Sequence, residues 1–113
     1  MKSEPLTIED TSGSQDGERV LRLKGPLLIS NLFEFQTKAR TDTSLTLVLD
    51  FTNVPYVDSA GIGALVGAYV SRQKENGRSL TLVGVNQRVR QALQVTHVEQ
   101  FFKFSEAPAA NQA

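Results

Sequence analysis

The sequence predicts a single α/β domain with a mixed, mostly parallel sheet of four or five strands and helices packed around it. Two strongly apolar segments, LTLVLDF at 45–51 and SLTLVGV at 79–85, are typical of central strands covered on both faces. A long helix candidate lies between them, and strand and helix candidates alternate from residue 19 onward. Strands joined by such helices pair in parallel through right-handed crossovers, so we expect 46–50 and 80–84 to be neighbouring or near-neighbouring parallel strands.

The composition narrows the possible functions. The chain has 113 residues, zero formal net charge and no cysteine. It therefore lacks the excess of basic residues that indicates nucleic-acid binding, and disulfide or thiol chemistry is excluded. No apolar run approaches the roughly 18 residues of a membrane span, and the N-terminus lacks the apolar segment of a signal peptide. We expect a cytoplasmic protein with no nucleic-acid or membrane partner.

The N-terminal quarter is expected to form a hairpin. After a flexible tail at 1–5, LTIED at 6–10 is a strand candidate, and TSGSQDGE at 11–18 is a cluster of turn-forming residues. RVLRLKG at 19–25 alternates between polar and apolar residues and predicts a second strand. The candidates for its core-facing side chains are Val20, Leu21 and Leu23.

Gly25 and Pro26 end this strand, because proline donates no ladder hydrogen bond. A helix is expected to begin near Ser30 or Asn31, where Asn31 and Glu34 have the spacing of a capping box. One face of that helix would carry Leu32, Phe35 and Ala39.

More apolar side chains surround this helix start than one helix face requires: Leu28, Ile29 and Phe33. They could pack in the core, or they could form an exposed patch that contacts a partner. The sequence leaves both interpretations open.

The stretch YVDSAGIGALVGAY at 56–69 opens a helix expected over about 59–75. Asp58 and Ser59 stand where the first-turn N–H groups of a helix lack intrahelical partners, and both residue types favour helix caps. Gly61 and Gly63 each cost roughly 1 kcal/mol relative to Ala inside a helix. This pattern indicates that something approaches the backbone closely at the first turn.

Two stripes run along this helix candidate. The first is apolar and would face the core: Ile62, Leu65, Val66, Tyr69 and Val70. The second consists of small residues: Ala60, Gly63, Ala64, Gly67 and Ser71. The small stripe could pack closely against the sheet of the domain, or its first turns could form a partner surface.

The C-terminal part predicts one more helix and an edge strand. Asn76-Gly77 should end the preceding helix, and Asn86 should cap the next one. This helix should end near Val95 to His97, with a residue at positive φ close to His97. VEQFFKF at 98–104 could form the last edge strand. The expected apolar helix face carries Val89, Ala92, Leu93 and Thr96.

No catalytic or metal constellation is apparent. His97 is the only histidine, and one histidine without cysteine does not make a typical zinc site. The segment GIG at 61–63 is not followed by the lysine of a phosphate-binding loop. We therefore expect a protein that is not an enzyme and needs no cofactor.

DSAGIGAL, together with the apolar strand before it, NGRSLTLVGV after the helix and VRQALQVTHVEQFFKF, resembles the STAS domain family, in particular the bacterial anti-sigma factor antagonists. The resemblance extends from about Thr7 to Phe104. It implies a STAS-like domain over 6–104 and a flexible tail at 105–113. The chain differs from the family pattern at Ala60, where a second Ser or Thr is common, and at Leu28, where Asp is usual.

By this resemblance, an anti-sigma factor serine kinase would phosphorylate Ser59 with ATP and Mg²⁺, and a phosphatase would reset it. The unphosphorylated chain would bind the kinase and free a sigma factor. The alternative is a scaffold subunit of a lipid ABC transporter or a stress-signalling complex, with Ser59 as a helix cap. Asp58 would cap the helix or assist the kinase. The implied partner-binding residues are Asp58, Ser59, Ala60, Gly61, Ile62 and Gly63.

Overall fold

The structure, a computed structural model, describes residues 5–13, 16–74 and 77–106. It contains one sheet with the strand order β1-β2-β3-β4-β5, so that strands adjacent in the sequence are adjacent in space. The strands are β1 (Thr7–Ser12), β2 (Glu18–Lys24), β3 (Thr46–Asn53), β4 (Ser79–Val83) and β5 (Lys103–Ser105). The helices are α1 (Phe33–Thr41), α2 (Ser59–Gln73) and α3 (Gln87–Val95), with a short 3₁₀ helix at Glu99–Phe101.

The predicted α/β class and mixed sheet are confirmed. β1 and β2 pair antiparallel as a hairpin, and the other neighbouring strands pair in parallel. The expected pairing of the two most apolar strands is present, with Leu47 opposite Leu80 and Leu49 opposite Leu82. All four of these leucines are buried.

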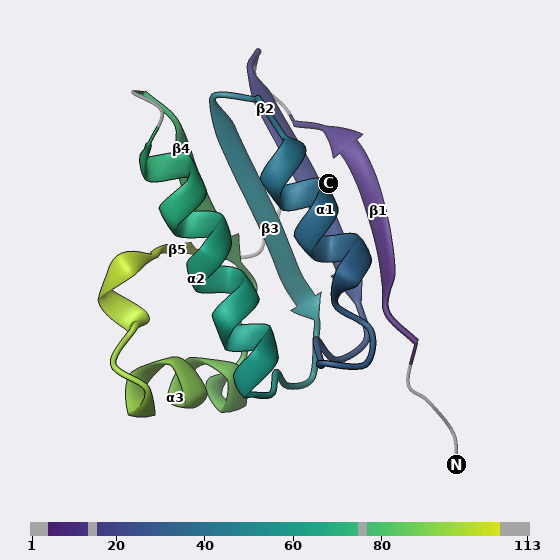
Figure 1. The fold of residues 1–113 in the computed structure, drawn as a ribbon, viewed down its shortest axis with the longest axis vertical. Coiled ribbons are helices and arrows are strands. Elements are labelled where there is room, and N and C mark those ends of the chain that lie inside the picture. The colour runs from purple at the N-terminus through teal and green to yellow at the C-terminus, as the bar shows by residue number, and fades with distance from the viewer. Residues whose placement is uncertain (1–4, 14–15, 75–76, 107–113) are drawn as a thin grey trace.

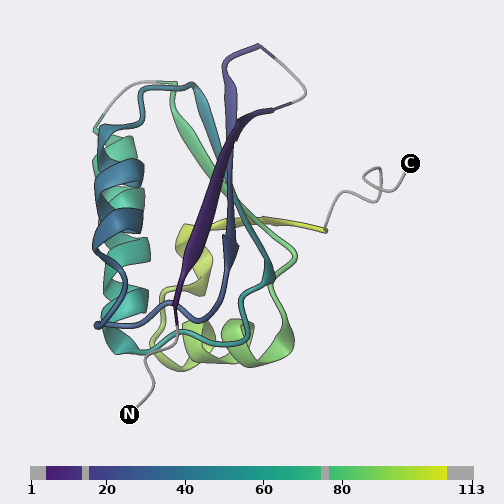
Figure 2. The same cartoon turned by 90° about the vertical axis from the view of Figure 1, so that its right-hand side faces the viewer.

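The helices do not cover both faces of the sheet. Figures 1 and 2 show α1 and α2 in one layer against one face, and α3 near the end of the sheet where β3 finishes. The other face carries no helix in the described part of the chain, so the expected covering of both faces is wrong. On that face, Val20 and Val48 are half-buried. Polar side chains around them keep the face compatible with water, and these include Arg22, Thr46 and Thr81.

Side chains along β2 point alternately to the two faces of the sheet, and this decides which of them face the helices. Leu21 and Leu23 are buried in the core, whereas Val20 is only half-buried. Because successive side chains point to opposite faces, Val20 lies on the face without helices. Its assignment to the core is wrong.

The capping box predicted for the first helix is also wrong. α1 begins at Phe33, and its N-cap Leu32 makes no side-chain capping hydrogen bond. The Asn31 side chain instead accepts from the Leu28 N–H at 2.9 Å and donates to the Pro26 carbonyl at 3.0 Å. Asn31 therefore closes the loop before the helix. The expected inward face of α1 is confirmed by the burial of Leu32, Phe35 and Ala39.

The α2 helix is rotated relative to its predicted apolar stripe. It buries Ile62 and Leu65, but Val66 and Tyr69 are half-buried and Val70 is 46% exposed. The helix is shorter than expected, ending at Gln73, and Asn76 lies outside the described residues. The side chains that α2 buries are, besides those two, Gly61, Ala64, Ala68 and Arg72.

The predicted cap and end of α3 are confirmed, but its predicted apolar face is confirmed only in part. Val89 and Leu93 are buried and Ala92 is half-buried, whereas Thr96 is exposed. The Asn86 side chain caps it by accepting from the Val89 N–H at 2.8 Å. After the C-cap Thr96, His97 has a φ of 62°. The His97 N–H donates to the Gln94 carbonyl and the Val98 N–H to the Leu93 carbonyl, each at 3.0 Å. This pair of bonds is a Schellman motif.

The predicted edge strand at 98–104 is only partly confirmed, because most of it forms the 3₁₀ helix and the strand covers Lys103–Ser105. Residues 1–4 and 107–113, most of the two predicted tails, lie outside the described residues. None of the described helices has the length and apolar character needed to cross a membrane.

Candidate functional site

The junction before α2 is organised by Asp58. This residue has an extended backbone, and one oxygen of its carboxylate accepts from the Gly61 N–H at 2.8 Å, which caps the helix. The other oxygen accepts from the Ile29 N–H at 3.0 Å. Asp58 thus connects the α2 N-terminus to the loop between β2 and α1. Its predicted capping role is confirmed.

The close backbone approach expected at the first turn exists at Gly61 only. A Cβ atom at Gly61 would lie 2.4 Å from the Leu27 carbonyl oxygen. That oxygen accepts from the Asp58 N–H at 3.2 Å, and Leu27 also forms a parallel bridge with Val57. At Gly63, by contrast, a Cβ would meet nothing within 4 Å. The interpretation of Gly63 as a close-packing residue is wrong.

Ser59 is the first residue of α2 and is exposed. Its hydroxyl makes no hydrogen bond to any residue that the structure describes, since the capping role belongs to Asp58. The interpretation of Ser59 as the N-cap is therefore wrong. The site presents a primary hydroxyl to solvent on a well-fixed backbone.

Apolar side chains are exposed beside this junction. Ile29 is 72% and Phe33 is 78% exposed, whereas Leu28 is half-buried. Core packing is therefore the wrong interpretation for Ile29 and Phe33. Since the Ile29 N–H donates to the Asp58 carboxylate, Ile29 adjoins the start of α2.

The small stripe of α2 borders a groove between α1 and α2, with a volume of about 480 Å³. Gly63 and Gly67 are exposed there and have open space where a side chain would be, whereas Ala64 is buried. Close packing of the small stripe against the sheet thus holds for Ala64 but is wrong for both glycines.

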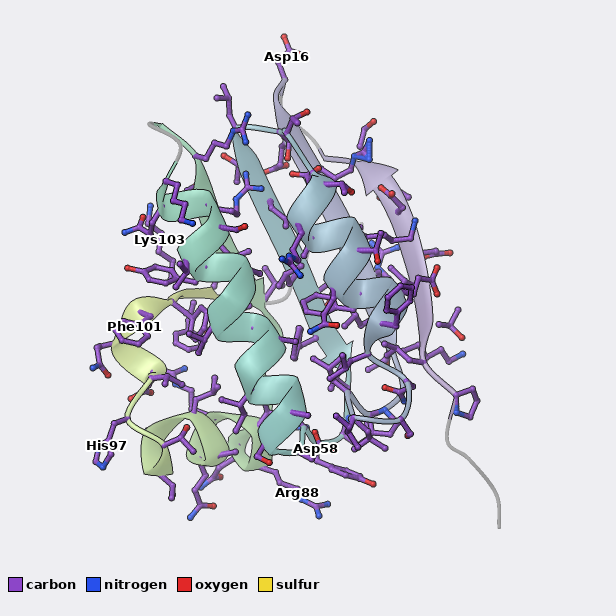
Figure 3. The ribbon with its side chains drawn as sticks, viewed as in Figure 1. Asp16, Asp58, Arg88, His97, Phe101 and Lys103 are labelled. Carbon is purple, nitrogen blue, oxygen red and sulfur yellow. The ribbon has the colours of Figure 1, made fainter. Side chains whose placement is uncertain are left out.

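The first turn of α3 lies against the segment that leads to Ser59. The Asn86 side chain, besides capping α3, donates to the carbonyls of Val54 and Pro55 at 3.1 and 3.3 Å. Two residues further on, the Arg88 guanidinium lies 4.7 Å from the centre of the Tyr56 ring. Figure 3 shows Arg88 and Asp58 at the same end of the molecule. Sequence reasoning missed Arg88, because no local pattern distinguishes it from an ordinary surface arginine.

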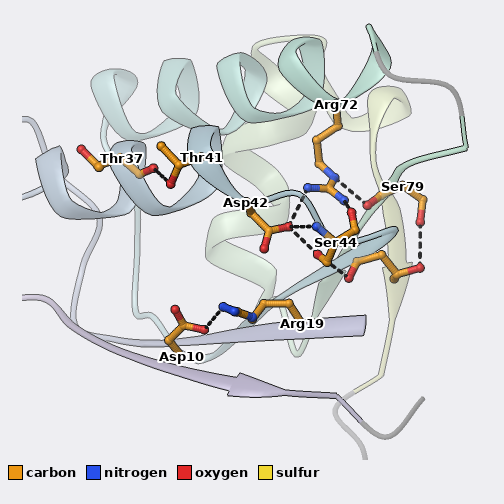
Figure 4. Close-up of polar contacts among 9 residues, drawn as sticks. Asp10, Arg19, Thr37, Thr41, Asp42, Ser44, Arg72 and Ser79 are labelled. Atoms are coloured by element: carbon orange, nitrogen blue, oxygen red, sulfur yellow. Dashed lines mark hydrogen bonds and ion pairs between the residues drawn. The ribbon is translucent and has the colours of Figure 1, made fainter. Parts of the chain in front are cut away.

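The opposite end of α2 is held by a buried charge (Figure 4). Arg72, only 4% exposed, donates to the Asp42 carboxylate at 3.0 Å and to the Ser79 carbonyl at 2.8 Å. A third bond goes to the Ser44 carbonyl. These contacts join α2 to the segment that precedes β3 and to the first residue of β4.

The carboxyl groups whose pKa values are shifted lie away from the start of α2. Burial on its own would raise the pKa of Asp50, but hydrogen bonds from the Thr52 hydroxyl and N–H, at 2.6 and 3.0 Å, and the nearby Arg22 outweigh it, so the pKa is lowered. A hydrogen bond from Arg90 lowers the pKa of Glu99. Among the described residues, no group of three His, Cys, Asp or Glu side chains could hold a metal ion.

Comparisons with known proteins agree with this architecture. The family model of the STAS domain matches residues 11–110. The anti-sigma-B factor antagonist of Staphylococcus aureus is 28% identical over 104 residues, which are 89% of this chain and 94% of that protein.

Solved structures share the fold. A putative anti-sigma factor antagonist from Thermotoga maritima is 18% identical with a TM-score of 0.78, covering 93% of this chain and 91% of the other. The unphosphorylated anti-sigma factor antagonist SpoIIAA is 19% identical with a TM-score of 0.74, covering 94% and 92%. The phosphorylated form of the Bacillus protein SpoIIAA is 18% identical with a TM-score of 0.70, covering 94% and 96%.

Proposed function

We propose that this chain, which belongs to the STAS domain family, is an anti-sigma factor antagonist switched by phosphorylation of Ser59. The unphosphorylated chain binds an anti-sigma factor serine kinase and thereby frees a sigma factor. The phosphorylated chain no longer binds, until a phosphatase removes the phosphate. The name of the Staphylococcus aureus relative and the phosphorylated form of SpoIIAA support this proposal.

The accessibility of Ser59 is the observation that carries the proposal. Its side chain is exposed at the first position of α2, while Asp58 fixes both the helix start and the neighbouring loop. A kinase can therefore reach the hydroxyl without unfolding the helix. Losing the hydroxyl also costs the fold little, because no hydrogen bond to another described residue depends on it.

The chain is the acceptor substrate in this reaction and not the enzyme. The Ser59 oxygen attacks the γ-phosphorus of MgATP, a new P–O bond forms, and the bond from that phosphorus to the β,γ-bridging oxygen breaks. ADP leaves, and a base of the kinase takes the hydroxyl proton. Hydrolysis by the phosphatase returns the hydroxyl and releases inorganic phosphate.

The partner surface proposed here is centred on the start of α2. Ser59 and Gly63 are exposed, and Asp58 and Ala60 are half-buried. Gly61 and Ile62 are buried, so they would shape this surface from below. Exposed apolar side chains that adjoin polar groups are typical of protein interfaces, and the ones that extend this surface are Ile29 and Phe33.

Intact mass after incubation with an anti-sigma factor serine kinase from the same organism and MgATP tests the proposal. The parent chain should gain one phosphate, and Ser59→Ala should gain none while still binding the kinase. Ser30→Ala is the matched control, because Ser30 is an exposed serine in the neighbouring loop, and that variant should still be phosphorylated.

A phosphate on a residue other than Ser59, or none with the cognate kinase, would contradict the proposed switch. Such a result, combined with stable association of the chain with a transporter or stress-signalling complex, would favour the scaffold function. Binding that is equally strong before and after phosphorylation would also exclude the switch.

A further inference from the structure

Arg88 is an exposed arginine that contacts an aromatic ring and no acidic side chain among the described residues. Its guanidinium carbon lies 4.7 Å from the centre of the Tyr56 ring. It forms no ion pair with any carboxylate that the structure describes. A guanidinium that lies over an aromatic ring keeps its full charge. The N–H groups at its outer edge remain available to donate hydrogen bonds.

The position of Arg88 is fixed relative to the segment that ends at Ser59. Asn86 caps α3 and also donates to the carbonyls of Val54 and Pro55, so the first turn of α3 cannot move independently of that segment. Tyr56 precedes Ser59 by three residues, which limits the distance between their Cα atoms to about 11 Å.

The other arginines show why Arg88 is distinctive. Four of the seven arginines form ion pairs with carboxylates: Arg19, Arg22, Arg72 and Arg90. Two of the remaining three lie at the far end of the sheet, since Arg40 is in the last turn of α1 and Arg78 directly precedes β4. Arg88 is the one arginine without a described carboxylate partner at the end where α2 begins.

We propose that Arg88 binds the phosphoryl group of phosphorylated Ser59. The planar guanidinium donates two parallel hydrogen bonds to phosphate oxygens, a geometry that arginine favours. Its charge also opposes the repulsion between the phosphate and the Asp58 carboxylate, whose oxygens already accept from two backbone N–H groups. The biological relevance rests on the proposed function, whereas the contact itself is a property of this chain.

The test uses phosphoserine installed genetically at residue 59, so that no kinase is needed. A ³¹P NMR titration at low ionic strength measures the second pKa of the phosphate, which is about 6 without such a contact. A guanidinium that is hydrogen-bonded to the phosphate lies about 4 Å from the phosphorus, and one positive charge at that distance in water lowers that pKa by about three quarters of a unit. We therefore expect Arg88→Gln to raise it by about that amount relative to the parent.

Two variants serve as controls. Arg40→Gln removes a charge at the opposite end of the domain, one that also has no described carboxylate partner, and should leave the phosphate pKa unchanged. Arg88→Lys keeps the charge without the planar fork and should fall between the parent and Arg88→Gln. At 1 M salt the difference between the parent and Arg88→Gln should shrink, because the Debye length is then about 3 Å.

A second readout does not depend on a substitution. In the parent, the Nε–H signal of Arg88 should shift during the titration of the phosphate. An identical phosphate pKa in parent and Arg88→Gln at low salt, or an Nε–H signal that ignores the titration, would overturn the proposal. Failure to find a kinase for Ser59 would instead count against the proposed function and leave this contact intact.

Discussion

The two ends of α2 differ in how they are held. At the C-terminal end, the buried Arg72 donates to Asp42 and to two backbone carbonyls from other segments. At the N-terminal end, Asp58 makes the fixing contacts and its neighbour Ser59 faces solvent. One end is thus anchored by a charge removed from water, and the other carries a hydroxyl that a partner can reach.

This difference separates stability from regulation along a single helix. A buried arginine must keep all its partners, because an unpaired buried charge is strongly unfavourable. An exposed first-turn serine has no such requirement. The end anchored by Arg72 therefore holds α2 in position on the sheet. The end that carries Ser59 can change its charge without disturbing that position.

The largest expected effect is at the anchored end. Arg72→Ala leaves the Asp42 carboxylate, whose side chain is 8% exposed, without its cation and frees two carbonyls. Removing one partner of a buried ion pair costs about 3–5 kcal/mol. Urea denaturation should show a loss of that size in the free energy of unfolding. Arg40→Ala, an exposed arginine at the same end, should change it by less than about 0.5 kcal/mol.

A loss below about 1 kcal/mol for Arg72→Ala would erase the contrast between the two ends. It would mean that water enters the site and solvates Asp42. The anchored end would then be no more restrictive than the exposed one.

A smaller effect is expected from a matched pair of glycines in the first turns of α2. Gly61→Ala places a methyl group 2.4 Å from the Leu27 carbonyl oxygen, and overpacking of this kind costs about 1–3 kcal/mol. Gly63→Ala meets open space and should gain up to about 1 kcal/mol from helix propensity. Chemical denaturation of both variants measures the difference, and equal stabilities would show that the loop at Leu27 yields easily.

These contrasts show which features a sequence can reveal. The strands β1 to β4, the Asn86 cap and the positive φ at His97 were predictable, because each depends on a local pattern of a few residues. The Asp58 cap belongs to the same class. Local hydrogen bonding and side-chain periodicity are enough to indicate such features in the sequence.

The remaining features depend on contacts between distant segments. Arginine is rarely buried, and nothing near Arg72 in the sequence indicates a partner thirty positions away at Asp42. Asn31 has a capping spacing, yet its amide bonds the loop at Pro26. The apolar Ile29 is exposed, and its backbone N–H donates to Asp58 in a distant segment. Tertiary geometry outweighed the local pattern in each case.

The end of α3 offers a smaller test, at a helix terminus that a Schellman motif closes. His97 is exposed at a φ of 62°, where an L-residue is strained by about 1–2 kcal/mol and glycine is not. His97→Gly should therefore be neutral or stabilise the fold by up to about 1 kcal/mol, since glycine is the usual residue at this position of a Schellman motif. Thermal unfolding measures this change in stability. Clear destabilisation would reveal that the imidazole makes a contact that stabilises the end of α3.

The smallest expected effect on stability is that of phosphorylation itself. A phosphoserine at residue 59 adds about −1.5 to −2 charges. The α2 dipole favours it by about 0.3–1 kcal/mol, whereas the Asp58 carboxylate opposes it by about 1–1.5 kcal/mol at 6 Å in water. These opposing effects nearly cancel, so the melting temperature of the free domain should change by only a few degrees. Amide shifts should change mainly within residues 55–65.

Binding of a partner changes that balance, because it removes water from the exposed end. At an effective dielectric near 20, the repulsion by Asp58 rises fourfold to about 4–6 kcal/mol, and the phosphate must also lose solvation. A loss of only about 2.7 kcal/mol weakens binding a hundredfold, so calorimetry should show kinase affinity at least tenfold lower after phosphorylation. Amide shift changes spread through the sheet would mean that the anchored end had moved too. The separation of stability from regulation along α2 would then fail.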